Sequence, residues 1–450
     1  MRPPRGLTVG RPVRVLFLAW GYSIHAWRRI ALFAGDPDFE VAVASPHDYG
    51  FANAVNVPLS GPARRKEIAE RLFRRQDHAS NLRELGFLGA NILRVRNKVR
   101  WHYGVGRALL GMGVADRGLH RSVVGSSDLL LEVETGIADL RILKDAAARF
   151  RPEVVFLQTL LYPACLAYYL PSNLPIMITF WNGDVTWWAQ WTGTERLLKK
   201  QMVAYGVRRA AAVTVNSRPA AEACLGYGAG AGNVHLIRYP GVDRARFRPA
   251  DKAGARSALG ISAPKVVLCP RGLGGYLNSD VIVAAAAAVA REIPGVLFLF
   301  VSGVGGEAEL ASHRQLAGNL GVADRCRWEG HVPWESMPAY YAASDAMVSV
   351  SSNDSLPNCM MEAMACGVPV ILGDIPELRE WVADGANGWL APPRDPAALA
   401  AKIVAALRDD GARAAEFARR NDDLVAREFD GARTVRQIKD LVRRVAGRPS

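Results

Sequence analysis

The stretch at 346–372 constrains the fold of this chain more than any other. Its first five residues, AMVSV, predict a short buried strand, and a polar loop follows them. Pro357 suits the first turn of a helix at 358–366, with Ser355 placed to cap it and Gly367 placed to end it. The apolar run VPVIL then predicts the next strand. Strand, loop, helix and strand in this order predict half of a parallel α/β sheet.

Two carboxylates occupy special positions in this unit. Asp354 lies in the loop at the carboxyl end of the first strand, and Glu362 lies eight residues later in the helix. Ligands of open α/β sheets bind outside the carboxyl ends of the strands. A helix amino end favours a phosphate, and carboxylates accept hydrogen bonds from sugar hydroxyls. The plainer interpretation is that Asp354 caps the loop and Glu362 is an ordinary helical glutamate.

The whole string favours the binding interpretation. EAMACGVPV at 362–370 resembles the motif of the family 4 retaining glycosyltransferases, which have the GT-B fold. In that family a glutamate stands eight residues before the glutamate of this motif, and here Asp354 takes its place. PEL at 376–378 and DGANGWLAPP at 384–393 are also similar to the family. The resemblance implies two Rossmann-like α/β domains with parallel sheets that face each other across a cleft.

The length of 450 residues allows about two or three domains. YPGVDRARFRP at 239–249 contains the glycine and prolines of a non-helical connection, and it is similar to the linker between domains in the family. We therefore expect an N-terminal acceptor-binding domain at 1–240 and a C-terminal nucleotide-sugar-binding domain at 241–425. By the same resemblance, the terminal segment at 426–450 returns as a helix to the first domain.

Apolar runs predict the strands of both sheets. We expect the first sheet at 13–18, 40–44, 154–157, 176–180 and 213–217, the last of which closes it, and the second at 265–269, 296–301, 325–329, 346–350 and 368–372.

The resemblance also implies a set of residues that bind the donor. The Gly-rich loop at 270–276 carries Arg271 and Gly272, which suit a diphosphate because glycine admits close backbone approach and arginine supplies paired donors. The family has a lysine later in this loop, and Tyr276 or Asn278 takes its place here. Glu362 would accept hydrogen bonds from ribose, and Asp354 would hold hydroxyls of the donor sugar. The remaining nucleotide-sugar residues would be Gly303, His331, Val332, Ser355, Leu356, Pro357 and Asn358.

Two further acidic motifs need separate interpretations. WNGD at 181–184 lies where the family often has HGSD, so Asp184 is a third candidate catalytic residue or, more plainly, a turn residue. Trp181 replaces the histidine of many members. DPD at 36–38 matches a metal-binding pattern, but its central proline predicts a turn. We expect no metal, and no cofactor besides the nucleotide-sugar co-substrate.

Charge and cysteine content limit which partners and which cellular location we expect. The chain has a net charge of +13, and the segment at 61–125 holds fourteen basic and five acidic residues. This basic insertion is interpreted as an amphipathic surface for anionic lipid, as solvated helix faces, or as a groove for an anionic acceptor. No motif supports nucleic-acid binding. The scattered cysteines indicate reduced thiols, and the apolar run at 13–20 is too short for a signal sequence. We expect a cytoplasmic protein, with the inner face of the membrane as a peripheral location.

The sequence therefore predicts a retaining glycosyltransferase that uses a UDP- or GDP-sugar. Its acceptor would be a glycan, a lipid-linked molecule or a small molecule, as in polysaccharide or glycolipid biosynthesis. Two alternatives stay open. A nucleotide-sugar epimerase would turn over donor without acceptor, and a degenerate GT-B binding or scaffold subunit would turn over no donor.

Overall fold

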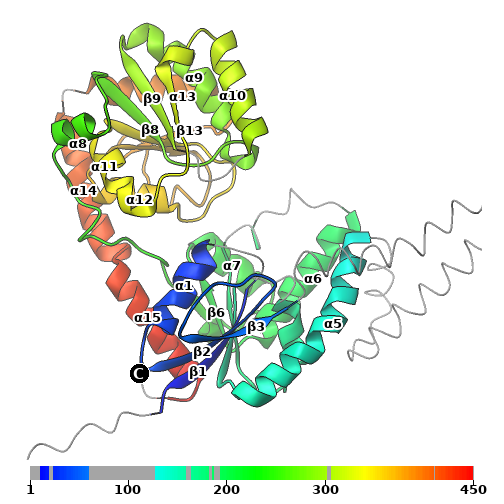
Figure 1. The fold of residues 1–450 in the computed structure, drawn as a ribbon. Coiled ribbons are helices and arrows are strands. Elements are labelled where there is room, and N and C mark those ends of the chain that lie inside the picture. The colour runs from blue at the N-terminus through cyan, green and yellow to red at the C-terminus, as the bar shows by residue number, and fades with distance from the viewer. Residues whose placement is uncertain are drawn as a thin grey trace, which may run out of the picture. The chain divides into compact units, whose positions relative to one another are not determined.

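The computed structural model describes residues 11–19, 24–59, 127–158, 164–181, 185–186, 193–301, 306–409 and 411–448 (Figure 1). The chain forms two compact units, each with one sheet. Unit 1 comprises Met1–Thr214, Glu222–His235 and Lys439–Ser450, and unit 2 comprises Val215–Ala221 and Leu236–Ile438.

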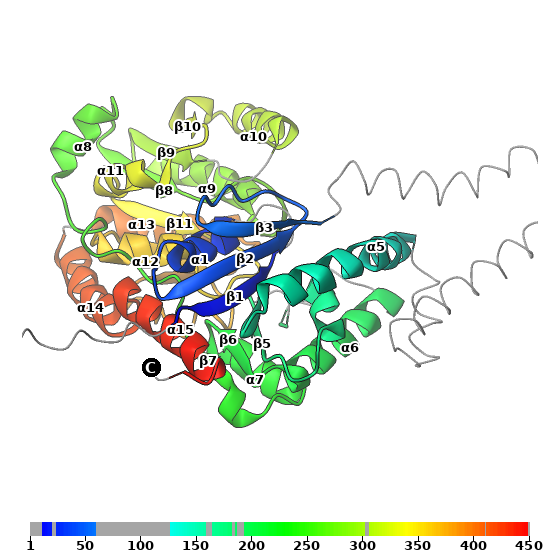
Figure 2. The ribbon, with the colours of Figure 1, turned by 60° about the horizontal axis from the view of Figure 1, so that its bottom comes forward.

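The sheet of unit 1 has seven strands in the order β3-β2-β1-β4-β5-β6-β7. Every neighbouring pair from β3 through β6 is parallel. The strands are β1 (Val13–Leu18), β2 (Phe39–Ser45), β3 (Ala54–Pro58), β4 (Val154–Leu157), β5 (Ile176–Thr179), β6 (Ala212–Val215) and β7 (Val234–Leu236). Its described helices are α1 (Ile24–Ala34), α5 (Ser127–Phe150), α6 (Gly193–Arg209) and α7 (Arg218–Gly226), the last shared with unit 2 (Figure 2).

The sheet of unit 2 has six parallel strands in the order β10-β9-β8-β11-β12-β13. They are β8 (Lys265–Cys269), β9 (Val296–Val301), β10 (Cys326–Glu329), β11 (Ala346–Ser349), β12 (Val370–Gly373) and β13 (Trp389–Ala391). The helices are α8 (Lys252–Ala258), α9 (Ser279–Glu292), α10 (Glu307–Asn319), α11 (Met337–Ala342), α12 (Asn358–Ala365), α13 (Pro396–Arg408), α14 (Ala412–Glu428) and α15 (Gly431–Val445), the last shared with unit 1.

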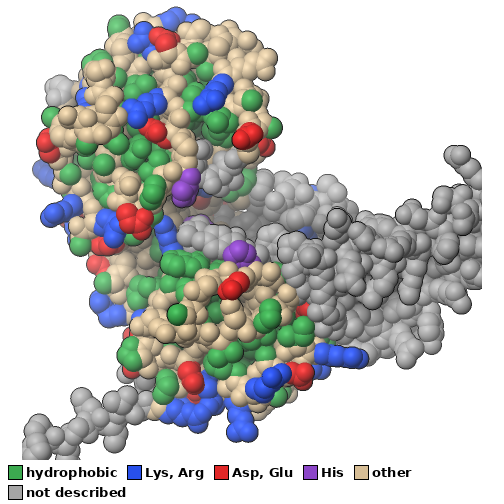
Figure 3. All heavy atoms as spheres, viewed as in Figure 1, with side chains coloured by type: hydrophobic (Ala, Val, Ile, Leu, Met, Phe, Trp, Pro, Cys, Tyr) green, Lys and Arg blue, Asp and Glu red, His purple; other side chains and the backbone are tan. Residues whose placement is uncertain are grey.

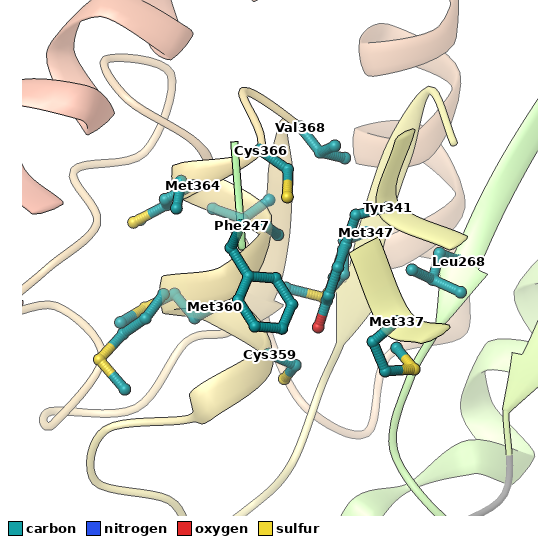
Figure 4. Packing of buried hydrophobic residues seen from close by; sticks show 14 of the residues in the cluster. Phe247, Leu268, Met337, Tyr341, Met347, Cys359, Met360, Met364, Cys366 and Val368 are labelled. Carbon is teal, nitrogen blue, oxygen red and sulfur yellow. The ribbon is translucent and has the colours of Figure 1, made fainter. Parts of the chain in front are cut away.

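Side chains of unit 2 point alternately to two faces of its sheet, as strand geometry requires. On β8, Val266 and Leu268 pack with α11, α12 and α14 in one apolar cluster (Figure 4). Val267 and Cys269 face the other way, into a cluster with α9 and α13. Both faces of the sheet are therefore buried, and ligands can approach it only at the strand ends.

The predicted central strands are confirmed to within about two residues, but the edges differ. The prediction that 213–217 closes the first sheet is wrong, because β7 follows β6 in that sheet. β3 and β13 were likewise not expected. β7 has three residues and none is buried, while β3 is mostly exposed and ends in a proline. Such edge strands lack the apolar runs that identify buried strands.

The carboxyl-terminal residues of α15 belong to unit 1 and bind acidic residues within it. Lys439 Nζ lies 2.6 Å from Asp36 Oδ2, and Arg443 lies 2.6 Å from Asp38 Oδ2. Asp36 and Asp38 belong to the predicted turn between α1 and β2, which is confirmed. Burial is the largest single influence and would raise the pKa of Asp36, but the hydrogen bonds from Lys439 and the Asp38 backbone, together with the charges of Lys439 and Arg443, lower it overall. The acidic motif at 36–38 therefore serves helix attachment.

Five cysteines in the described part of the chain are buried free thiols, as the sequence predicts. Within that same part, no helix is both long and apolar enough to cross a membrane. On the face in Figure 3, basic and acidic side chains are interspersed. The basic insertion at 61–125 lies outside the described residues.

Candidate functional site

The strand order of unit 2 reverses between β8 and β11. From this pair, the sheet continues through β9 and β10 on one side and through β12 and β13 on the other. Open parallel sheets bind ligands outside the carboxyl ends of the strands at such a switch point. The loops that leave this point contain Arg271, after β8, and Asp354, after β11.

Arg271 and Asp354 join these two loops directly. The Arg271 guanidinium donates to Asp354 Oδ2 across 2.5 Å. Asp354 also accepts from Ser351 Oγ at 3.1 Å and from the backbone N–H of Ser355 at 3.0 Å. Burial would lower the pKa of Arg271, but neighbouring groups, with the Asp354 carboxylate first among them, together raise it well above its usual value. The guanidinium therefore stays charged, and its other N–H groups suit an anionic ligand.

Asn278 fixes the same two loops to each other. It is 2 % exposed and adopts a left-handed backbone conformation, with φ of 52°. Its Nδ2 donates to Val350 O at 2.8 Å and to Ser352 Oγ at 2.7 Å, and its Oδ1 accepts from Arg394. Tyr276, in contrast, is 40 % exposed. Of the two residues expected where the family has a lysine, Asn278 is committed to the loop framework and Tyr276 faces solvent.

Glu362 lies in α12 and is 8 % exposed. Its Oε1 accepts a hydrogen bond from Trp334 Nε1 at 2.8 Å, and its Oε2 accepts one from the Tyr341 hydroxyl at 2.9 Å. Burial, followed by the Glu362 charge, raises the pKa of Tyr341 well above its usual value, so its hydroxyl remains a donor. These two donors occupy two of the about four acceptor positions of the carboxylate.

The loop after β10 reaches Glu362 through Trp334. His331 is exposed in this loop, and Val332 packs against the apolar cluster of α11 and α12. Because Trp334 donates to Glu362, the loop and the glutamate belong to one site.

The start of α12 completes this edge of the sheet. Pro357 precedes the helix, which begins at Asn358, so its first backbone N–H groups are available for an acceptor. The prediction that Ser355 caps the helix is wrong. Its hydroxyl contacts Asn216 Oδ1 at 2.5 Å instead, and no side chain caps α12.

A second polar cluster lies at the switch point of unit 1, where the strand order reverses between β1 and β4. Gln158 directly follows β4 and is 4 % exposed, and both polar atoms of its side chain lack a hydrogen-bond partner among the described residues. Trp181 Nε1 donates to the Gln158 carbonyl at 2.9 Å, and the Arg29 guanidinium lies 4.6 Å from the Trp181 ring centre. Buried amides are nearly always paired, so Gln158 marks a position suited to a bound polar molecule.

Residues 252–422 match the family described as glycosyl transferases group 1. These residues form a group 1 glycosyltransferase domain. The match covers most of unit 2 and all of the candidate site built on Arg271, Asp354 and Glu362.

Curated relatives and solved structures extend this comparison. The D-inositol 3-phosphate glycosyltransferase of Geodermatophilus obscurus is 38 % identical over 179 residues, which are 38 % of this chain and 40 % of that protein. A second such protein, from Catenulispora acidiphila, is 36 % identical over 231 residues, which are 50 % and 53 % of the two chains. The chain thus spans about half the length of the curated relatives it matches.

The fold agrees with solved structures over almost the whole chain. HepE of Anabaena, solved with UDP, has a TM-score of 0.66 at 18 % identity and covers 96 % of this chain and 99 % of its own. Sucrose-phosphate synthase of Thermosynechococcus elongatus has a TM-score of 0.68 at 17 % identity, with coverages of 97 % and 99 %. The predicted GT-B fold is therefore confirmed, with one parallel α/β sheet in each unit.

The group 1 domain brings most of the predicted donor residues to one sheet edge. Arg271, Asp354 and Ser355 are linked by hydrogen bonds or chain neighbours, and Gly272 and Leu356 are buried beside them. Gly303 and Asp184, also predicted for the site, lie outside the described residues. Among the residues that the structure does describe, no cluster of three or more His, Cys, Asp or Glu side chains could hold a metal ion.

Three residues near these sites were not predicted from the sequence. Trp334 and Tyr341 gave no chemical signal, because their roles depend on packing that brings both to Glu362. Gln158 interrupts the apolar run of 154–170, and this interruption was the one sequence signal that could have identified it.

Proposed function

We propose that this chain is a retaining glycosyltransferase that transfers a sugar from a nucleotide-diphosphate sugar to an acceptor hydroxyl. The observation that carries the proposal is the Arg271–Asp354 contact, which joins both loops at the switch point of a group 1 glycosyltransferase domain. The glycosyltransferase names of the relatives and the UDP bound to HepE support it.

In this proposal each end of the donor meets a different carboxylate. Glu362 accepts hydrogen bonds from the ribose hydroxyls, beside the loop at 330–334 that holds the base. Asp354 holds hydroxyls of the transferred sugar. Arg271 and the amino end of α12 bind the diphosphate between them, since both present N–H donors to an anion.

The reaction breaks the bond between the sugar anomeric carbon and the leaving phosphate oxygen. Negative charge grows on that oxygen, and fixed donors lower the barrier most where charge develops. The acceptor oxygen bonds to the anomeric carbon on the face that the phosphate leaves, and its proton passes to the phosphate. No protein base and no metal ion takes part in this scheme.

On the acceptor side we propose that the Gln158 amide binds an acceptor hydroxyl. An amide both donates and accepts, which suits a hydroxyl. Because the amide is buried, either hydrogen bond would remove the free-energy cost of an unsatisfied polar group. The acceptor is a glycan, a lipid-linked molecule or a small polyol. D-inositol 3-phosphate, named in the relatives, is the first small molecule to test.

The basic insertion at 61–125, with a net charge of +9, would bring the enzyme to an anionic membrane surface. Co-sedimentation with phosphatidylserine vesicles, compared with neutral phosphatidylcholine vesicles, tests this part alone. Equal binding to both vesicle types would contradict it.

The transferase proposal is tested by thermal stability with UDP, GDP, ADP, CMP and their common sugars. A ligand at a hundredfold its Kd should stabilise the fold by about 2.7 kcal/mol. Glu362→Ala should weaken binding of the selected nucleotide by the ~1.5–3 kcal/mol of a charge-assisted hydrogen bond. Asp354→Ala should reduce transfer more than nucleotide affinity.

The alternatives give different results in the same experiment. Turnover of donor without acceptor would identify an epimerase. No stabilisation by any nucleotide would favour a non-catalytic subunit, which the short Asp354 and the absent lysine make worth testing.

A further inference from the structure

The Glu362 carboxylate is held by two aromatic side chains from outside its own helix. Trp334 comes from the loop after β10 and Tyr341 from α11, and each donates to a different oxygen of the carboxylate. An indole N–H can only donate, and the raised pKa of Tyr341 keeps its hydroxyl protonated. The plane of the Glu362 carboxylate is therefore fixed from two directions before any ligand binds.

Both aromatic donors rest on the segment that leads into unit 2. Phe247, in the motif at 239–249, is 1 % exposed, and its ring centre lies 5.4 Å from that of Trp334 and 6.0 Å from that of Tyr341. Figure 4 shows the Phe247 ring directed toward the hydroxyl end of Tyr341. The Arg246 guanidinium lies 4.6 Å from the Trp334 ring centre. Two consecutive residues of this linker thus contact the two groups that orient Glu362.

The linker itself is held by the junction of α14 and α15. The Val242 N–H donates to Phe429 O at 2.7 Å, and the Gly431 N–H donates to Val242 O at 3.1 Å. A Cβ on Gly241 would lie 2.7 Å from the Gly431 Cα, so the close approach requires glycine. Contacts therefore run without interruption from the helix junction through the linker and the aromatic pair to Glu362.

We propose that Trp334 and Tyr341 are positioning residues that orient Glu362 for ribose, and that linker residues Arg246 and Phe247 hold them in place. This inference rests on the proposed function, in which Glu362 binds the ribose hydroxyls. A correctly oriented carboxylate gains more from a hydroxyl than a rotated one, because hydrogen bonds weaken steeply with angle. The linker thus contributes to nucleotide recognition without touching the nucleotide.

The test compares nucleotides that differ only in ribose. Kd is measured by calorimetry for UDP, GDP and ADP, and for the 2′-deoxy and 3′-deoxy forms of the tightest binder. The wild-type protein should bind one deoxy form about 10- to 150-fold more weakly, as loss of a charge-assisted hydrogen bond predicts. In Tyr341→Phe and in Trp334→Phe this ratio should fall by about threefold or more, since the carboxylate is no longer fixed.

Tyr340→Phe is the matched control. It makes the same chemical change one position earlier in α11, at a tyrosine 8 % exposed. The ratio should stay at the wild-type value in this variant. A purely structural effect of Tyr341→Phe would weaken the ribose and deoxyribose forms equally and leave the ratio unchanged.

Each outcome has one meaning. Failure of every nucleotide to bind overturns the proposed function and this inference together. Wild-type binding without discrimination overturns the ribose role of Glu362. Discrimination that persists in both Tyr341→Phe and Trp334→Phe overturns this inference alone.

The linker is tested by Phe247→Leu, which should lower the same ratio while the protein remains folded by circular dichroism. Arg246→Gln changes a partly exposed side chain and should lower the ratio less. It provides the test of the linker if Phe247→Leu does not fold. An unchanged ratio in the folded linker variants would overturn the role of the linker.

Discussion

The two switch points of this protein differ in how their polar groups are satisfied. In unit 2, Arg271, Asp354 and Asn278 bind one another or neighbouring loops. In unit 1, the buried amide of Gln158 has no partner among the described residues. Polar groups that hold one another are oriented before the ligand arrives, whereas an unsatisfied amide costs free energy until something binds it. The edge of unit 2, which we propose binds the donor (the donor edge), is preorganised. The edge of unit 1, which we propose binds the acceptor (the acceptor edge), would be completed by a bound molecule.

The largest effect should come from the donor edge. Arg271→Met removes the cation that binds the leaving diphosphate in the proposed function, and we expect turnover to fall about 10²–10³-fold. Initial transfer rates with the donor selected by the nucleotide panel measure this. Arg394→Met is the control, because Arg394 is an exposed arginine that binds Asn278 and Asp280 at the same edge. Rates of Arg271→Met within threefold of wild type would contradict a preorganised diphosphate site.

The framework of the donor edge can be broken separately. Asn278→Gly keeps the left-handed backbone conformation accessible but removes the side-chain bonds to Val350 and Ser352, so the free energy of unfolding should fall by about 1–3 kcal/mol. Chemical denaturation measures this. Asn278→Ala should cost about 1 kcal/mol more, because alanine is strained at positive φ. Equal stability of the glycine variant and the wild type would mean that these bonds do not hold the loops.

At the acceptor edge, removing the polar side chain should stabilise the fold, whereas at the donor edge it should destabilise it. Gln158→Met replaces an unsatisfied buried amide with an apolar side chain of similar size. We expect the free energy of unfolding to rise by up to about 1 kcal/mol. Transfer to the acceptor should fall while nucleotide affinity stays unchanged. Gln315→Met, at an exposed glutamine of α10, controls for the substitution itself. A lower Tm and normal transfer in Gln158→Met would remove the contrast between the two edges.

The smallest effect concerns Glu377, which follows β12. Burial, and to a smaller extent the charge of Asp354, raises the pKa of Glu377 above 4.5. A raised pKa in the folded state means that the ionised form destabilises the fold at neutral pH, and that protonation at low pH removes this cost. Glu377→Gln should therefore raise the Tm at pH 7. The gain in the free energy of unfolding should be less than about 1 kcal/mol, because solvent screens the charge.

The pH dependence of this variant is the check. The gain in Tm over the wild type should shrink as the pH falls from 7 through the raised pKa of Glu377, and it should be lost below about 4.5, the ordinary value at which Glu377 is protonated in the unfolded chain. A gain that is constant from pH 7 to pH 4 would have another cause.

The sequence predicted how the residues of the proposed donor edge are arranged better than it predicted those of the proposed acceptor edge, and the reason is physical. Asp354, Glu362 and Gly367 lie in one continuous stretch, where short-range rules of strand, helix and turn fix their positions. Arg271 was identifiable because a Gly-rich loop follows a clear strand. These residues needed no knowledge of long-range packing.

Residues whose roles depend on packing could not be predicted. Trp334 and Tyr341 meet Glu362 only because the loop after β10 and α11 pack beside α12. Asn278 was predicted as one of two substitutes for a lysine. Its left-handed conformation and its bond to Val350 could not be predicted, because they depend on packing against a loop far away in the sequence. The cap expected from Ser355 failed because a residue 139 positions away, Asn216, takes its hydroxyl instead.

The attachment of α15 has a consequence for how the protein is made. Asp36, Asp38 and Glu153 bind Lys439, Arg443 and Arg448, so unit 1 includes residues that are synthesised only after those of unit 2. During synthesis the first sheet must wait for the entire second unit before its acidic partners are neutralised. A nascent chain stalled before residue 439 would therefore carry an incomplete first unit, exposed to chaperones and proteases until the segment at 439–448 has been synthesised.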